Sequence, residues 1–264
     1  MLELRHITKT FNAGTVNEKV ALNDICLKLE EGDFVTIIGG NGAGKSTMLN
    51  AVAGAWLPDC GSVIVDGVDV TDMPEYKRAK FLGSVFQDPR MGTATDMWLE
   101  ENLAIAKRRG EKRTLRWAIT RKEREEYQEL LKQLDLGLEH RLTTKMGLFS
   151  GGQRQAVTLL MAAMKKPKLL LLDEHTAALD PKTAAKVLEI TDKIISENKL
   201  TALMVTHNMK DAIAHGNRLI MMNAGKIILD IRGEEKKNLT VEMLLAAFSK
   251  ASGADFANDR ALLG

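Results

Sequence analysis

The chain has 264 residues and a formal net charge of +2 at pH 7, which allow one large domain or two small ones and give no global argument for a nucleic-acid partner. Its two cysteines, Cys26 and Cys60, lack metal-ligand spacing, so we expect packing residues in a reduced cytosolic protein rather than a disulfide framework. The first residues alternate like a strand, unlike a signal peptide, and no apolar run approaches the ~20 residues that cross a bilayer, so we expect a soluble chain.

Short strands and turns alternate in the N-terminal part of the chain. The apolar spacing predicts strands at Leu2–Phe11 and at residues 25–29, with a turn at residues 12–15. Phe34–Ile38 is a short apolar run rich in β-branched residues, which predicts a buried parallel strand. We therefore expect antiparallel β structure that leads into a parallel core.

A glycine-rich loop follows this buried strand directly. Residues 39–46, GGNGAGKS, match G-x-x-x-x-G-K-[ST] in full, and helical spacing continues to residue 53. Glycines allow a tight turn whose backbone N–H groups surround a polyphosphate, Lys45 can reach the β- and γ-phosphates, and the Ser46 hydroxyl can ligate Mg²⁺. A glycine-rich turn with a chance lysine would lack this context, so we predict a nucleoside triphosphate site. Its predicted residues are Gly39, Asn41, Gly42, Ala43, Gly44, Lys45, Ser46 and Thr47.

Beyond the loop, the pattern of apolar residues changes twice. Strand and turn signals alternate through residues 62–86, with a short helix at residues 74–81, and then give way to a mostly helical block. Within this block one helix should begin near Leu99, with Thr95 or Asp96 as its N-cap, and a charged helix should cover residues 121–134. After residue 166, strands at residues 169–172 and 202–205 alternate with helices and precede a final hairpin. The helical block is therefore interpreted as a subdomain inserted into an α/β core.

An acidic pair follows the apolar strand at residues 169–172. Burial of that strand places Asp173 at its carboxyl end, the usual ligand edge of an open α/β sheet, where it can hold Mg²⁺ directly or through water. Glu174 is the natural general base for an attacking water. Alone, such a pair is as often only a strand end or a helix start, but together with the phosphate loop it predicts a nucleotide-hydrolysing site.

A second glycine-rich helix start lies at residues 149–153, FSGGQ. Ser150 is a good N-cap, and the two glycines expose backbone N–H groups to a phosphate. One nucleotide needs only one such cradle, so we expect this one to close on the nucleotide held by another copy of the chain. A loop that only caps a helix would explain the stretch if it stood alone. Its predicted nucleotide-contacting residues are Ser150, Gly151, Gly152 and Gln153.

With these three stretches, the chain resembles the ATP-binding-cassette (ABC) ATPases over most of its length. Residues 39–47 look like their Walker A motif, residues 149–153 like their signature and residues 169–174 like their Walker B motif. The resemblance implies an α/β P-loop NTPase (RecA-like) core with an antiparallel β subdomain and an inserted α-helical subdomain. It also implies a single ABC ATPase domain over residues 1–264, with the core at 1–88 and 166–232, the helical signature subdomain at 89–165 and a C-terminal tail at 233–264.

The same resemblance assigns further residues. Gln87 stands where the family has its Q-loop glutamine, Asp180 falls in the D-loop, and Phe11 stands where an aromatic ring stacks on adenine. His207 matches the switch histidine that contacts the γ-phosphate, whereas His175 departs from the pattern because a proline is common there. The implied catalytic residues are Glu174, His207 and Gln87, and the implied Mg²⁺ ligands are Ser46, Gln87 and Asp173. The family also implies that two copies trap two ATP molecules head-to-tail, with Ser150 and Gly152 capping the γ-phosphate in trans.

Two functional classes follow from this resemblance. A single cassette without a fused permease resembles importer subunits, which implies a homodimer at the cytoplasmic face of the cell membrane, docked on transmembrane permease subunits near residues 87–102. A solute-binding protein would be an indirect partner, and phrases such as GNRLIMMNAGKIILD resemble amino-acid-type uptake systems. The alternative is a soluble ATP switch in translation or DNA repair, although those relatives usually have twin cassettes, coiled coils or zinc-ligand cysteines.

The sequence allows two interpretations of the basic run and two of the C-terminal tail. The basic run at residues 107–122 suits either anionic lipid headgroups near a permease or a solvated helix face. The tail from residue 234 contains a predicted helix at residues 240–248, which packs either on the core or on the partner copy.

Overall fold

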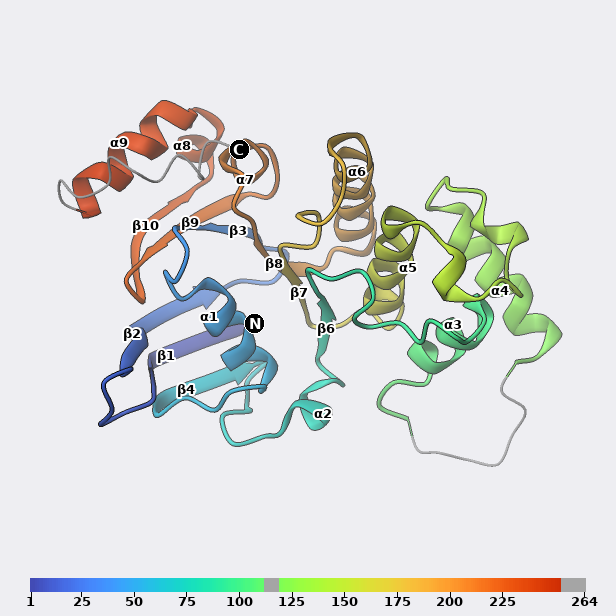
Figure 1. Ribbon diagram of the computed structural model, residues 1–264, viewed down its shortest axis with the longest axis horizontal. Coiled ribbons are helices and arrows are strands. Elements are labelled where there is room, and N and C mark those ends of the chain that lie inside the picture. Colours follow the sequence, from blue (N-terminus) through green and yellow to red (C-terminus); the bar gives the residue numbers. More distant parts are fainter. Residues whose placement is uncertain (112–118, 253–264) are drawn as a thin grey trace.

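The computed structural model describes residues 1–111 and 119–252, which form two β-sheets and surrounding helices (Figure 1). The strands are β1 (Leu2–Phe11), β2 (Lys19–Leu29), β3 (Phe34–Ile38), β4 (Cys60–Val65), β5 (Val68–Asp69), β6 (Leu82–Val85), β7 (Leu169–Asp173), β8 (Thr201–Val205), β9 (Arg218–Asn223) and β10 (Lys226–Arg232). The helices are α1 (Lys45–Ala53), α2 (Glu75–Arg78), α3 (Leu99–Lys107), α4 (Arg121–Lys132), α5 (Gly151–Ala163), α6 (Pro181–Asn198), α7 (Met209–Ala214), α8 (Glu234–Lys237) and α9 (Val241–Ser252), with 3₁₀ turns at Leu138–His140 and Met146–Leu148.

The two sheets have different strand directions. The smaller sheet is antiparallel with the order β2-β1-β4-β5, and the larger has the order β10-β9-β3-β8-β7-β6. Strands β9, β3, β8, β7 and β6 of the larger sheet are parallel neighbours, whereas β10 returns antiparallel beside β9. An antiparallel β subdomain and a parallel core are thus both present, as the sequence predicted.

The central strands β3, β7 and β8 of the larger sheet are buried on both faces, and the alternation along β7 shows what covers each face. Leu169 and Leu171 lie in the same apolar cluster as the side chains of α1 and the antiparallel sheet. Leu170 and Leu172 lie in the cluster that contains α5 and α6. Each buried leucine stabilises the fold by roughly 1.5–3 kcal/mol. Helices α1 and α5 therefore cover opposite faces of the larger sheet (Figure 1).

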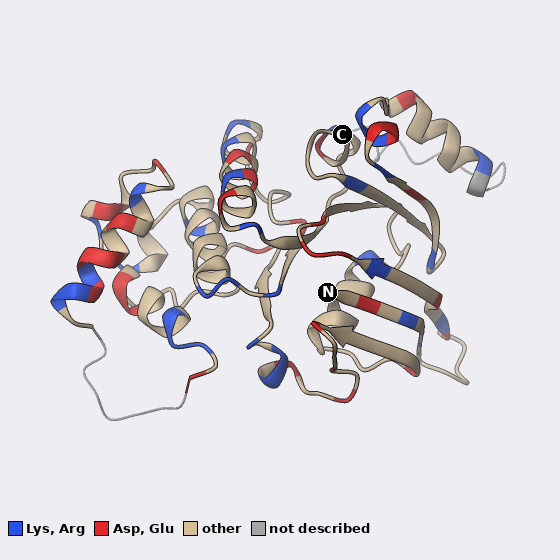
Figure 2. Ribbon diagram, turned by 180° about the vertical axis from the view of Figure 1, so that it is seen from behind, with Lys and Arg blue, Asp and Glu red and all other residues tan. Residues whose placement is uncertain are grey.

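Helices α3, α4 and α5 pack together at one end of the molecule (Figure 1). Tyr127 and Leu131 of α4 are buried in the same cluster as Leu103 of α3. Two residues of the basic run are paired with acids on α4, since Lys107 contacts Glu126 and Arg108 contacts Glu123 at 3.0 Å, and Figure 2 shows both signs of charge on α4. This favours the solvated-face interpretation for these two residues, while residues 112–118 of the run lie outside the described residues.

A fully buried arginine connects the end of α1 to the chain that leads into α2. The Arg78 guanidinium donates hydrogen bonds to the carbonyl oxygens of Ala51 and Val52 at 2.7 and 2.8 Å, and to those of Thr71 and Met73 at 2.8 and 2.7 Å. The last carbonyls of a helix have no partner within it, so this side chain supplies the missing donors. Burial lowers the pKa of Arg78, and the carboxylates of Asp72 and Asp69 oppose that shift.

The structure corrects the predicted N-cap of α3 and the predicted packing of the two cysteines, and it shows where the tail helix packs. The N-cap of α3 is Trp98 rather than Thr95 or Asp96, because the Glu101 carboxylate accepts a hydrogen bond from the Trp98 backbone N–H at 2.7 Å. Both cysteines are exposed rather than packed. They lie on strands of the antiparallel sheet, which buries only one face. The tail helix, α9, packs on its own chain, where its apolar face joins the cluster around α7.

Within the described residues, no helix is both long and apolar enough to span a bilayer.

Candidate active site

The glycine-rich loop joins β3 to α1 and passes unusually close to neighbouring backbone. Gly39 has φ 153°, and a Cβ atom there would lie 2.2 Å from the carbonyl oxygen of Met222. Gly44 has φ 102°, and its Cβ would lie 2.5 Å from the carbonyl oxygen of Ala21. Only glycine tolerates such contacts, so the spacing of the motif reflects backbone crowding as well as ligand approach.

Lys45 is buried within the loop that it follows. Its ammonium donates hydrogen bonds to the carbonyl oxygens of Gly39 and Gly40 at 2.7 and 3.1 Å. Burial lowers the pKa of Lys45, while the negative charges of Glu174 and Asp173 act in the opposite direction. Gly44, the N-cap of α1, provides no side-chain hydrogen bond, and the first turn of α1 contains no acidic residue. The N–H groups of that turn and the Lys45 ammonium therefore form a positive site suited to phosphate oxygens.

A cavity of about 280 Å³ lies over this loop. It is lined by Phe11, Lys19, Ala21, Glu174 and residues 41–47 of the loop. Lys19 was not predicted from the sequence. It pairs with Phe11 across the β1–β2 hairpin, and its Nζ lies 2.9 Å from where a Cβ of Gly42 would stand. Only the strand register, which bulges interrupt, reveals that this cation faces the loop.

Phe11 lines this cavity and touches a second aromatic ring. Trp56 meets it edge-on, with ring centroids 5.3 Å apart and an interplanar angle of 83°. This T-shaped arrangement is a preferred aromatic geometry and fixes the orientation of the Phe11 ring. The predicted stacking of Phe11 on adenine stays a prediction.

The acidic pair lies at the carboxyl end of β7, facing the start of α1. The Ser46 hydroxyl donates a hydrogen bond to the Asp173 carboxylate at 3.1 Å. Burial raises the pKa of Asp173, the hydrogen bond from Ser46 opposes this, and the neighbouring charge of Glu174 adds to it. A half-buried carboxylate of raised pKa, next to a hydroxyl, is a donor pair that a divalent cation would stabilise.

Glu174 and His207 meet at the ends of two adjacent strands. Glu174 has the left-handed backbone conformation, with φ 43°, and its N–H donates to the carbonyl oxygen of Val205 at 3.0 Å. His207 Nδ1 lies 3.7 Å from Glu174 Oε2. Strained backbone of this kind is common at functional sites because the surrounding structure holds the side chain in one direction. The geometry suits a carboxylate base with a histidine beside it.

The remaining predicted residues do not line this cavity. Gln87 is exposed just beyond β6. Ser150 caps α5, since its hydroxyl accepts a hydrogen bond from the Gln153 N–H at 3.2 Å and the Gln153 side chain accepts one from the Ser150 N–H at 3.1 Å. Asp180 caps α6 through the Thr183 N–H at 3.1 Å. The capping predicted for Ser150 is therefore confirmed, while contact of these residues with a nucleotide stays a prediction.

The two glycine-rich helix starts belong to helices on opposite faces of the larger sheet. Helix α1 covers the face of the larger sheet to which Leu169 and Leu171 point, and α5 covers the face of Leu170 and Leu172. Ser150 is exposed at the start of α5. None of the residues at the start of α5 lines the cavity over the loop before α1.

Comparison with known proteins agrees with this geometry. Residues 22–177 match the family model for ABC transporters. The chain is 42% identical over 251 residues to a tyrosine transport ATP-binding protein of Clostridioides difficile, covering 95% of this chain and 100% of the relative. It is 33% identical to the methionine import ATP-binding protein MetN of Corynebacterium efficiens, covering 86% of this chain and 61% of that longer protein.

Solved structures also match. A dimeric ATP-binding cassette, MJ0796, in a post-hydrolysis state with ADP and Pi, has a TM-score of 0.75 at 30% identity, covering 88% of this chain and 98% of that one. Fold and site together define an ATP-binding-cassette ATPase with a P-loop core. The chain belongs to the ABC transporter family, as an ATP-binding subunit that hydrolyses ATP. The family and fold class predicted from the sequence are thus confirmed.

Proposed function

We propose that this chain energises an importer of a small, amino-acid-like solute by hydrolysing ATP beside transmembrane permease subunits. The observation that carries the proposal is the full-length match to a tyrosine transport ATP-binding protein, at 42% identity over 251 residues. Other similar relatives are named for import of methionine and of spermidine or putrescine, at 33–34% identity. A peripheral position at the cytoplasmic face of the membrane follows from this role, and a solute-binding protein would deliver the cargo to the permease.

The working unit in this proposal is a dimer of two copies. Ser150, Gly151 and Gly152 do not line the nucleotide cavity of their own chain, and Ser150 is exposed, so we assign them to the nucleotide of a partner copy. A two-fold dimer forms two such composite sites at once. The dimeric state of the MJ0796 cassette supports the same arrangement.

Mg²⁺ fits the donors at the end of β7. A hydroxyl and a carboxylate are oxygen ligands of the kind that Mg²⁺ takes alongside phosphates, so Ser46 and Asp173 would hold the ion, with Gln87 as a further predicted ligand. When bound, the ion neutralises charge that develops on the phosphates. Glu174 accepts the proton of the attacking water, and His207, 3.7 Å from that carboxylate, orients the group and donates toward the γ-phosphate.

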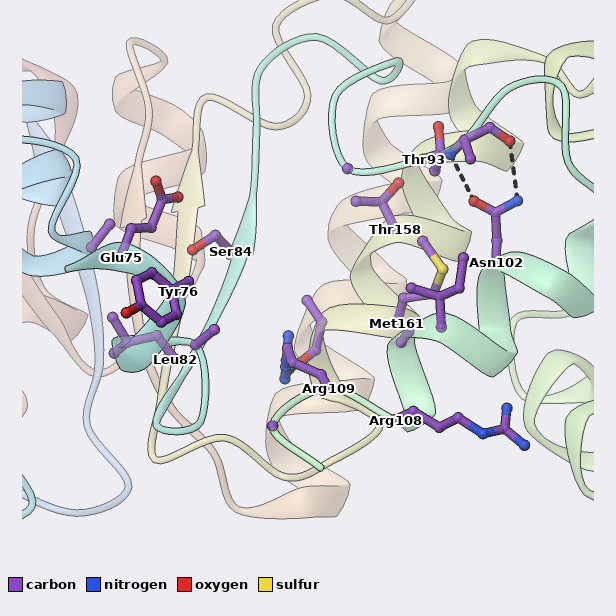
Figure 3. A pocket seen from close by; sticks show the side chains of 18 of the residues that line it. Glu75, Tyr76, Leu82, Ser84, Thr93, Asn102, Arg108, Arg109, Thr158 and Met161 are labelled. Carbon is purple, nitrogen blue, oxygen red and sulfur yellow. Dashed lines mark hydrogen bonds between the residues drawn. The ribbon is translucent and has the colours of Figure 1, made fainter. Parts of the chain in front are cut away.

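The permease-docking surface in this proposal is a large groove beside α3. Its volume is about 1340 Å³, and Figure 3 shows the labelled lining side chains, which come from the α2 region on one side and from α3 and α5 on the other. Tyr76 and Ile105 are 74% and 58% exposed there, and Arg108 and Arg109 border them. Glu75 and Glu111 line the same groove and Arg108 is paired with Glu123, so the exposed apolar side chains, rather than a charge of one sign, suit a short amphipathic permease segment.

The test is capture of the tagged chain from detergent-solubilised native membranes, followed by mass spectrometry. A multi-span protein in equal amount is the expected result. Ile105→Glu, in the groove, should abolish this capture, whereas Val16→Glu, which alters a fully exposed loop residue elsewhere, should not. Recovery with ribosomes or nucleic acid and without a membrane protein would exclude the importer and support the soluble switch.

A further inference from the structure

Two opposed β-bulges interrupt the β1–β2 hairpin and gather three potential metal ligands. Leu4 pairs with Leu27 and Ile7 with Ile25, so two residues of β1 lie opposite Cys26 alone. The next pair is Lys9 with Leu22, which leaves two residues of β2 opposite Thr8. Each bulge contains one non-glycine residue in the left-handed conformation, His6 with φ 52° and Asp24 with φ 56°.

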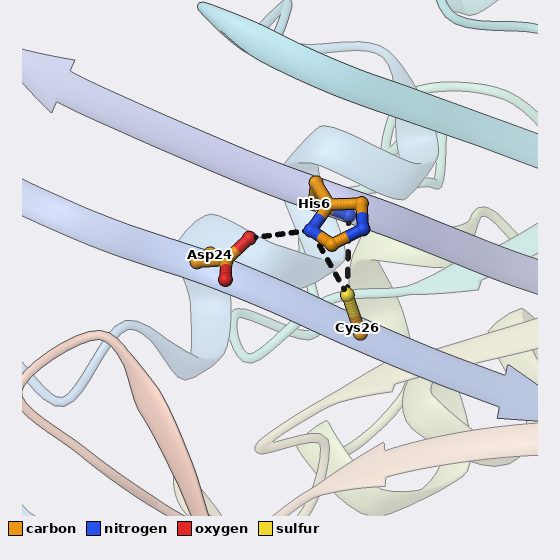
Figure 4. A group of neighbouring side chains, drawn as sticks. All are labelled: His6, Asp24 and Cys26. Carbon is orange, nitrogen blue, oxygen red and sulfur yellow. Dashed lines mark hydrogen bonds and ion pairs between the residues drawn. The ribbon is translucent and has the colours of Figure 1, made fainter.

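These bulges direct His6, Asp24 and Cys26 to one exposed face of the sheet (Figure 4). Ile7, Ile25 and Leu27 occupy the opposite, buried face. Bulges redirect side chains and are over-represented next to functional sites, and a left-handed residue is maintained only where the surrounding structure imposes it. None of the three residues lines the nucleotide cavity, so the ATPase site does not account for their placement.

The distances between these donors fit a tetrahedral metal ion. The Nδ1 of His6, a carboxylate oxygen of Asp24 and the Sγ of Cys26 all lie within 4.8 Å of one another. With Zn–S near 2.3 Å and Zn–N near 2.0–2.1 Å, tetrahedral coordination sets sulfur and nitrogen about 3.6 Å apart. The separation of Cys26 Sγ and His6 Nδ1 is 3.6 Å.

The third ligand needs only a small adjustment. His6 Nδ1 and Asp24 Oδ1 are 2.8 Å apart, as a hydrogen-bonded pair, whereas two ligands of one zinc ion would be about 3.4 Å apart. The side chains of His6 and Asp24 are 75% and 65% exposed, so neither is confined by packing. The backbone N–H of His6 donates a hydrogen bond to Cys26 Sγ at 3.3 Å, which orients the sulfur toward the ring.

The donor types select the class of ion. A thiolate, an imidazole and a carboxylate favour Zn²⁺ or a similar borderline-soft divalent ion over Mg²⁺ or Ca²⁺, which prefer oxygen alone. The basic neighbours Arg5 and Lys28 are each paired with a carboxylate, Glu3 and Glu30, at 2.8 and 2.9 Å. We propose that His6, Asp24 and Cys26 form a surface site for Zn²⁺, separate from the ATP site, with water as the fourth ligand. Binding releases the thiol proton of Cys26 to solvent.

Titration of the nucleotide-free chain with Co²⁺ tests this site, because Co²⁺ can replace Zn²⁺ and absorbs visible light whereas Zn²⁺ does not. We expect one equivalent of Co²⁺ to produce thiolate charge-transfer absorption and tetrahedral d–d bands, and one equivalent of Zn²⁺ to remove both. Cys26→Ser should abolish the charge-transfer band. The matched control is Cys60→Ser, which removes the other exposed cysteine, on β4 and outside the cluster, and should leave the spectrum unchanged.

Two further variants separate a metal site from a hydrogen-bonded surface triad. His6→Ala and Asp24→Asn should each weaken Zn²⁺ binding, measured by calorimetry, by at least about 10-fold, since even second-shell partners of a metal are worth 10–100-fold. ATP binding, measured in parallel, should be unchanged and shows that each variant is folded. The proposal is overturned if no sulfur-based band develops, if Cys60→Ser loses the band as Cys26→Ser does, or if His6→Ala binds Zn²⁺ as the parent chain does.

Discussion

The two glycines at the start of α5 provide a matched pair for testing how this helix is seated. A Cβ added at Gly152 would lie 2.0 Å from Cγ2 of Thr183, on α6, whereas one added at Gly151 would lie 3.3 Å from Cδ2 of Leu179. The first contact is far inside van der Waals distance, and the second requires only a few tenths of an ångström from a flexible side chain. We therefore predict that Gly152→Ala forces α5 and α6 apart, while Gly151→Ala is tolerated.

The magnitude follows from two opposing terms. Overpacking of a tight contact typically lowers the free energy of unfolding by about 1–3 kcal/mol, whereas replacing a helical glycine by alanine raises it by roughly 0.5–1 kcal/mol. Gly152→Ala should thus lower the free energy of unfolding by about 1–2 kcal/mol, and Gly151→Ala should leave it unchanged or raise it slightly. Because Thr183 also donates its N–H to the α6 cap, Asp180, the strain falls on the D-loop.

Equilibrium urea unfolding of four chains measures this effect. Thr183→Ser removes the offending Cγ2 atom, so Gly152→Ala should cost little in that background, and the double-mutant cycle should give a coupling of about 1 kcal/mol or more. An equal loss in both backgrounds, or no loss in the parent chain, would refute the proposed contact.

Three further predictions concern single residues. Glu174→Gln should lower ATP turnover by ~10²–10⁴-fold in a phosphate-release assay while ATP binding persists, and near-normal turnover would remove Glu174 from the mechanism. Burial lowers the pKa of His175 to about 4 in the folded chain, and His215 adds to the shift. In the unfolded chain the pKa is near 6.5, so as the pH falls the unfolded chain takes up a proton first and the folded chain loses stability. The parent chain should lose about 2 kcal/mol more unfolding free energy between pH 7 and pH 5 than His175→Gln, and parallel pH profiles would contradict this. Arg78→Leu leaves four carbonyl oxygens without their donor and should lower the free energy of unfolding by about 3 kcal/mol or more. Arg78→Lys should recover only part of this loss, because an ammonium lacks the planar fork of donors. A melting temperature of Arg78→Leu equal to that of the parent chain would be incompatible with this role.

Most of the fold could be predicted because local patterns agree with tertiary structure. The buried run of β3 and the N-terminal strand both have the bounds that apolar spacing indicated. The errors occurred where tertiary contacts decide the outcome. Trp98 caps α3 through the side chain of another residue, and cysteine, often a buried residue type, was placed inside although Cys26 alternates with the buried Ile25 and Leu27.

The part of the site that lies at the carboxyl ends of parallel strands could be predicted from the sequence. Asp173, Glu174 and His207 come together because they lie at or just beyond the carboxyl ends of β7 and β8, which are adjacent parallel strands. Lys19 could not be assigned, because its approach to the loop depends on a register that two bulges shift. The opposite placement of α1 and α5 likewise emerges only once the alternation along β7 is assigned to the two faces.

Mixing two inactive variants tests whether a second copy of the chain completes the ATP site. Lys45→Ala disables the phosphate loop, and Ser150→Arg blocks the start of α5. In a head-to-tail dimer of the two, one site combines the intact loop of one chain with the intact α5 of the other. We expect the mixture to regain ATP hydrolysis that neither variant has alone. A mixture as inactive as its folded components would contradict a site completed by a second copy.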